Sequence, residues 1–137
     1  MGFFKRLLGI CDTQPPADPS CWSFSDGRLT IDLGKASELA SNGGAMRLEG
    51  GNLPSRVLVF RDEDGAAHAF ENKCTHAGRR LDPKPGSTEV RCCSVGKTTF
   101  DASGKRLSGS GKEDIVAFDV TEDDGKMTIE LVPGVGV

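Results

Sequence analysis

The stretch that decides the fold reads Val57-Leu58-Val59-Phe60-Arg61-Asp62-Glu63-Asp64-Gly65-Ala66-Ala67-His68-Ala69-Phe70. Its first four residues are all apolar, which is typical of a buried strand. The acidic run that follows ends in Gly65, and a glycine-terminated turn of this kind favours reversal of the chain. Residues 66–70 are therefore expected to pair with residues 57–60, and the stretch predicts a β-hairpin.

Alternating apolar residues predict further strands on both sides of this hairpin. They stand at Leu29, Ile31 and Leu33, at Val116, Phe118 and Val120, and at Met127, Ile129 and Leu131. The last two strands are joined by residues 122–125, a second acidic turn that ends in glycine, and are expected to form a second hairpin. A short helix is predicted at residues 36–40. Short strands without a long helix or an internal repeat indicate an all-β fold, either an antiparallel sandwich or a small barrel.

The composition supports this class and excludes others. The chain has 137 residues, among them 18 glycines and 7 prolines, which favours one domain of strands joined by tight turns. A formal net charge of −3 excludes a general binder of nucleic acid, which would carry a basic excess. No apolar run approaches the roughly 20 residues that a membrane span requires.

The first 20 residues are expected to lie outside the folded domain, which is expected to span residues 21–137. The apolar cluster in residues 1–11 is too short and too interrupted for a secretory signal. It is expected to pack on its own domain or on a neighbour, with a surface membrane anchor as the alternative. Three prolines in residues 12–20 predict a linker. The protein is therefore predicted to be cytoplasmic with reduced thiols, and paired cysteines are expected to be metal ligands rather than disulfides.

Residues 71–114 do not follow the strand pattern. This segment carries three of the five cysteines and one of the two histidines. A long, weakly periodic insertion between two hairpins is usually functional. Cys11 and Cys21, which lie outside it, are expected to be incidental thiols, with distant ligation or oligomer contacts as the alternative. The chemistry of the protein is therefore expected in residues 71–114.

Two motifs stand out in this segment. The first is Cys74-Thr75-His76, in which a cysteine and a histidine two residues apart can aim at one metal centre. The second begins at Cys92-Cys93 and is followed by Phe100-Asp101 and Gly104. Together they resemble Rieske-type [2Fe–2S] ferredoxin domains, which carry C-x-H in one loop and C-x-x-H-G-x-x-F-D-x-x-x-G in a second. The resemblance extends from about Trp22 to Val132.

The resemblance implies a small antiparallel β base with a cluster-binding subdomain inserted at about residues 71–114. It also implies a [2Fe–2S] cluster with two thiolates on one iron and two imidazoles on the other. Cys74, His76, Cys92 and Cys93 are the candidate cofactor and metal ligands.

The sequence departs from the family pattern at the second histidine. Val95 takes that position if the motif is aligned on Cys92, and Gly96 takes it if the motif is aligned on Cys93. His68 is the other histidine of the chain, and its place in a predicted strand favours a structural role. In a third loop, Gly109-Ser110-Gly111 replaces the Gly-Pro-Ala of the family.

Three interpretations follow. In the first, a [2Fe–2S] cluster is bound by Cys74, His76 and one or both of Cys92 and Cys93. A neighbouring thiolate, Lys97 or an external ligand then completes the set. In the second, the fold persists without a cluster and serves protein–protein interaction. In the third, the vicinal pair Cys92-Cys93 performs thiol chemistry.

The first interpretation predicts a one-electron carrier without a substrate pocket. Its partners would be redox proteins, namely a reductase and a terminal oxidoreductase. Arg79, Arg80 and Lys84 lie near the first motif and are expected to form a solvated edge or a docking patch for an acidic redox partner.

Overall fold

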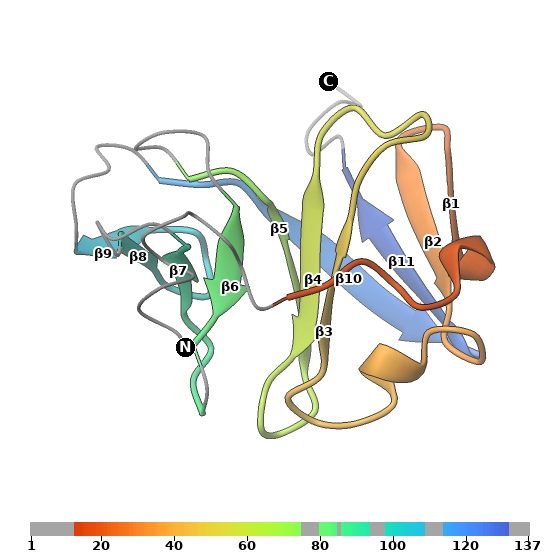
Figure 1. Ribbon diagram of the computed structural model, residues 1–137, viewed down its shortest axis with the longest axis horizontal. Helices are drawn as coiled ribbons and strands as arrows, with labels where there is room; N and C mark the ends of the chain where they lie inside the picture. Colours follow the sequence, from red (N-terminus) through yellow and green to blue (C-terminus); the bar gives the residue numbers. More distant parts are fainter. Residues whose placement is uncertain (1–12, 75–79, 85, 94–97, 109–113, 132–137) are drawn as a thin grey trace.

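A computed structural model describes residues 13–74, 80–84, 86–93, 98–108 and 114–131. These residues form two antiparallel sheets, which confirms the all-β prediction (Figure 1). The larger sheet contains, in spatial order, β1 (Trp22–Ser25), β2 (Arg28–Asp32), β11 (Lys126–Glu130), β10 (Ala117–Asp123), β5 (Ala67–Glu71), β4 (Val57–Arg61) and β3 (Ala45–Leu48). The smaller sheet contains β6 (Leu81–Pro83), β7 (Val90–Cys92), β8 (Thr99–Phe100) and β9 (Arg106–Ser108).

Both predicted hairpins are present. Strands β4 and β5 pair antiparallel, with Val57 opposite Glu71 and Arg61 opposite Ala67. The second hairpin has a shorter turn than expected, because residues 122 and 123 still pair with β11. Asp124 and Gly125 alone reverse the chain, with φ angles of 52° and 76°. Two consecutive residues with positive φ match the right-handed twist of the flanking strands, which explains the tighter turn.

The expected helix at residues 36–40 is a single 3₁₀ turn, η2 (Ser37–Leu39). A second 3₁₀ turn, η1 (Pro19–Cys21), begins with the side chain of Asp18 accepting a hydrogen bond from the main-chain nitrogen of Ser20. No helix in the described part of the chain is long and apolar enough to cross a membrane.

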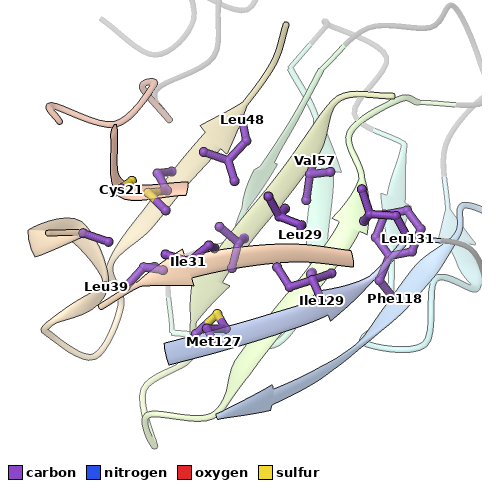
Figure 2. Packing of buried hydrophobic residues seen from close by; sticks show 14 residues of the cluster. Cys21, Leu29, Ile31, Leu39, Leu48, Val57, Phe118, Met127, Ile129 and Leu131 are labelled. Atoms are coloured by element: carbon purple, nitrogen blue, oxygen red, sulfur yellow. The ribbon is translucent and has the colours of Figure 1, made fainter. Parts of the chain in front are cut away.

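The all-apolar strand β4 is explained by burial on both of its faces. Val57 and Val59 join a core formed with β2, β3 and β11, whose members include Leu29, Ile31 and Ile129 (Figure 2). Leu58 and Phe60 point to the opposite face and join a second core. That second core consists of Leu58, Phe60, Phe70, Cys74, Leu81, Val90, Cys92, Phe100 and Ile115. The β4–β5 hairpin therefore separates the core of the large sheet from the core that holds the small sheet.

The segment that the composition predicts to be a linker contacts both sheets. The main-chain oxygen of Gln14 accepts a hydrogen bond from the nitrogen of Arg47 on β3, with a distance of 3.0 Å. The nitrogen of Thr13 donates to Oδ1 of Asp82 on β6, also at 3.0 Å. Residues 13 and 14 thus bridge the two sheets on one side.

Candidate metal centre

Two strands of the small sheet bring the predicted motifs together. Leu81 is the first residue of β6 and pairs with Cys92, the last residue of β7. The main-chain nitrogen of Cys93 donates to the oxygen of Arg80 at 3.0 Å, which continues the pairing by one step. The chain segment that follows Cys74 therefore returns to the sheet directly beside Cys92.

The cysteines of the two motifs differ in oxidation state. Cys74 and Cys92 are not in disulfides, both are fully buried, and both belong to the second core. Cys93 is disulfide-bonded. The expectation of reduced thiols is wrong for Cys93, because disulfide formation depends on separations in the fold that sequence spacing does not show.

Asn72, two residues before Cys74, holds the first loop at its base. Its Oδ1 accepts a hydrogen bond from the main-chain nitrogen of Leu81 at 2.7 Å, across residues 73–80. Its main-chain nitrogen donates to the oxygen of Arg56 at 2.9 Å, and its main-chain oxygen accepts from Nε of Arg56 at 3.0 Å. His76, the histidine of the first motif, lies outside the described residues.

The second loop is closed by a main-chain hydrogen bond from the nitrogen of Cys92 to the oxygen of Thr98, with a distance of 2.7 Å. Val95, Gly96 and Lys97 lie between these residues and outside the described part of the chain. The same is true of the third loop, Gly109-Ser110-Gly111.

The residues that follow the second loop explain the Phe-Asp-x-x-Gly pattern in structural terms. Phe100 is fully buried in the second core. Oδ1 of Asp101 accepts hydrogen bonds from Ser103 and from the nitrogen of Lys105, and the Ser103 hydroxyl contributes most to lowering the pKa of this carboxyl. Gly104 has a φ of +91°, and its main-chain oxygen accepts from the nitrogen of Ile115 at 2.8 Å. The motif thus builds the turn that anchors the small sheet to the start of β10.

His68 has the structural contacts that its position in a strand predicts. Its Nε2 lies 2.8 Å from Oδ2 of Asp62, and its ring lies 5.1 Å from that of Phe60. The hydrogen bond with His68 is the largest contribution to a lowered pKa of Asp62. Asp62 lies in the turn of the β4–β5 hairpin, and β5 runs from this turn toward Cys74. His68 is therefore engaged at the opposite end of β5 from the first loop.

Two of the three predicted docking residues form ion pairs within the chain. Arg80 binds Glu49 through two hydrogen bonds, Nε to Oε2 at 2.5 Å and Nη2 to Oε1 at 2.8 Å. This contact joins the first loop to the end of β3, and it holds the pKa of Glu49 below its usual value. Lys84 pairs with Glu89 at 3.2 Å. Arg79 lies outside the described residues.

The donor set fits one half of a Rieske cluster. Two buried cysteines from different segments, neither in a disulfide, suit the thiolate-bound iron. The chain has two histidines in all, and His68 is bonded to Asp62, so His76 is the one imidazole left for the other iron. Within the described ranges, no group of three or more histidine, cysteine, aspartate or glutamate side chains is gathered as a metal site.

Comparison with known proteins identifies the family. The profile of the Rieske [2Fe-2S] domain matches residues 30–119, and the chain belongs to this family. A relative in sequence is the glycine betaine monooxygenase oxygenase subunit of Pseudomonas aeruginosa, 34% identical over 90 residues. The match covers 65% of this chain and 20% of that protein, so the chain spans about a fifth of the length of this relative.

Solved structures agree with this assignment. The ferredoxin of carbazole 1,9a-dioxygenase from Nocardioides aromaticivorans IC177 is 25% identical, with a TM-score of 0.55 over 65% of this chain and 86% of that chain. The quaternary ammonium Rieske monooxygenase CntA shares the fold at 21% identity, with a TM-score of 0.54 over 72% of this chain and 30% of that chain. Family and likeness together support an electron-transfer protein of the Rieske class.

Proposed function

We propose that the chain binds a [2Fe–2S] cluster through Cys74, Cys92 and His76, with residues 71–114 as its cluster-binding part, and carries one electron at a time between redox proteins. The observation that carries the proposal is that Cys74 and Cys92 are buried in one core and that neither is in a disulfide. A sulfur in a disulfide has no thiolate to donate, which favours Cys92 over Cys93 as the second cysteine ligand.

The cluster supplies reversible one-electron chemistry when it is bound. In the proposed ligand set, Cys74 and Cys92 hold one iron and His76 holds the other. The position of the second imidazole is filled by a ligand that is not a histidine of this chain, such as Lys97 or an external ligand.

The proposed partners are a reductase that donates the electron and a terminal oxidoreductase that accepts it. Support comes from the likeness to a ferredoxin that belongs to a dioxygenase and from the sequence relationship to an oxygenase subunit.

The test is the cofactor content of anaerobically prepared and reconstituted protein. We expect about two irons and two acid-labile sulfides per chain in the unsubstituted protein. Cys74→Ser and Cys92→Ser should abolish both, whereas Cys93→Ser should retain them. Cys21→Ser is the matched control, because Cys21 is a buried free thiol in the other core.

A colourless protein that stays free of iron after reconstitution would contradict the proposal. It would favour the second candidate, a cluster-free Rieske-fold module for protein–protein interaction. The specific observation behind that candidate is the single imidazole that remains available in this chain.

A further inference from the structure

Asn72 is a fully buried polar side chain whose orientation is determined by its contacts. The atom that faces the main-chain N–H of Leu81 must be an acceptor, and it is therefore the amide oxygen, at 2.7 Å. The main-chain nitrogen and the main-chain oxygen of Asn72 are both hydrogen-bonded to Arg56, the residue before β4. These three bonds hold the residue between the large sheet and β6.

The amide nitrogen of Asn72 is buried and has no hydrogen-bond partner among the residues that the structure describes. Glu38 and Arg47 also carry an unpartnered buried side-chain atom, but both residues are partly exposed, whereas Asn72 is 0% exposed. A buried donor without an acceptor destabilises the folded protein, because its bond to water is lost and not replaced. Such a group in a native core indicates an acceptor outside the described residues.

Asn72 lies next to both cysteine-bearing segments. Asn72 precedes Cys74 by two residues, and its amide oxygen is bonded to Leu81, which is the strand partner of Cys92. Cys74 and Cys92, neither of which is in a disulfide, belong to the same buried core as Leu81. A cluster held by these two cysteines would supply sulfur acceptors beside Asn72.

We infer that Nδ2 of Asn72 donates a hydrogen bond to a sulfur atom of the bound cluster, either a cysteine thiolate or an inorganic sulfide. The inference rests on the proposed function. Asn72 is then a positioning residue with two roles, since its Oδ1 closes the first loop and its Nδ2 contacts the cluster. Hydrogen bonds to the sulfurs favour the reduced, more negative state, so this bond raises the reduction potential.

The test compares the reconstituted unsubstituted protein with Asn72→Leu, which removes both roles without adding charge. The measurements are the reduction potential and the shift of the Fe–S stretching frequencies on exchange into D₂O. We expect a lower potential, a smaller isotope shift and faster loss of the cluster in Asn72→Leu. Unchanged potential and isotope shift in an iron-loaded variant would overturn the inference and leave the proposed function intact.

A second variant covers the case in which Asn72→Leu loses its iron or its fold. Asn72→Asp keeps the oxygen that accepts from Leu81 and removes both N–H donors. Asn52→Asp is its matched control, because Nδ2 of Asn52 donates to the oxygen of Phe24 in an exposed part of the large sheet. For Asn72→Asp the isotope shift is the informative measurement, because the added negative charge alters the reduction potential by itself. A reduced shift in Asn72→Asp alone supports the inference, and an unreduced shift overturns it. If the unsubstituted protein binds no iron, both the inference and the proposed function are wrong.

Discussion

Leu81 and Cys92 are direct partners in the β6–β7 pair. The end of the first loop and the start of the second therefore lie side by side, at the same end of the β6–β7 pair. The hydrogen bond that Oδ1 of Asn72 accepts from the main-chain nitrogen of Leu81 holds the first loop at this point. The main-chain bond between Cys92 and Thr98 fastens the second. Two short pairings thus place Cys74 and Cys92, which are 18 residues apart in the sequence, into one buried core.

The reduction potential should depend on the number of imidazole ligands, of which this chain is proposed to supply one instead of two. Rieske and plant-type ranges lie roughly 250–700 mV apart, because neutral imidazoles replace anionic thiolates in the former. With His76 as the single imidazole, we expect a potential between these ranges. Val95→His restores the spacing Cys-x-x-His relative to Cys92 and should raise the potential by about 100 mV or more.

Gly96→His is the matched control for that experiment, because it restores the same spacing relative to Cys93. It should leave the potential nearly unchanged, and protein-film voltammetry can measure both variants. A larger response in Gly96→His would show that Cys93 rather than Cys92 is the cluster ligand. A normal Rieske potential in the unsubstituted protein would show that a second histidine has been recruited.

Gly104→Ala should destabilise the fold. A Cβ at this position would overlap the main-chain oxygen of Ile115, and the φ of +91° is unfavourable for residues with a side chain. We expect a loss of about 1–3 kcal/mol in the free energy of unfolding, measured by urea denaturation. Gly125→Ala is the control, because Gly125 also has a positive φ but faces open space. Equal losses in the two variants would exclude the clash with Ile115 as the cause.

The ion pair of Glu49 with Arg80 should make stability depend on pH on the acid side. The pKa of Glu49 is lowered from its ordinary value of 4.5, first by the hydrogen bond from Arg80. A carboxyl with a lower pKa in the folded state stabilises the protein above pH 4.5, and this contribution is lost as the pH falls through the folded-state value. Since both side chains are partly exposed, the contribution is about 1 kcal/mol or less.

The variant that tests this is Glu49→Gln, followed by thermal unfolding between pH 3 and 7. Its Tm should lie below that of the unsubstituted protein near neutral pH, and the two should converge at low pH. Glu130→Gln removes the exposed pair with Arg28 and should change the Tm little at any pH. A constant difference in Tm for Glu49→Gln across the pH range would contradict the assignment.

Amide hydrogen exchange should distinguish the two sheets. Strand β4 is paired on both sides and buried on both faces, whereas β9 is an edge strand with Leu107 48% exposed. We expect amides in β7 to β9 to exchange faster than those in β4 and β10 when the cluster is absent. Uniform protection in the cluster-free protein would show that the two sheets open as one unit.

Local patterns in the sequence are sufficient for the elements and the family. Alternation at Leu29 and Ile31, and at Met127 and Ile129, predicts the strands because side chains alternate between the faces of a sheet. Gly65 and Gly125 predict the two hairpin turns because they tolerate positive φ. The motif Cys74-Thr75-His76, with Phe100-Asp101 downstream, is enough to indicate the Rieske class.

Contacts between distant residues were not accessible from those patterns. Sequence spacing alone does not distinguish Cys92 from Cys93. Adjacent residues of a strand point to opposite faces of the sheet, and their surroundings differ only when the neighbouring strands are in place. Asn72 carries no signal beyond its place before Cys74, yet its bonds to Leu81 and Arg56 depend on the packing of β6 against the large sheet. The same holds for Arg80, which bonds Glu49 from 31 positions away. Periodicity determines which face of the sheet a side chain points to, whereas the packing of the two sheets determines which residues it contacts.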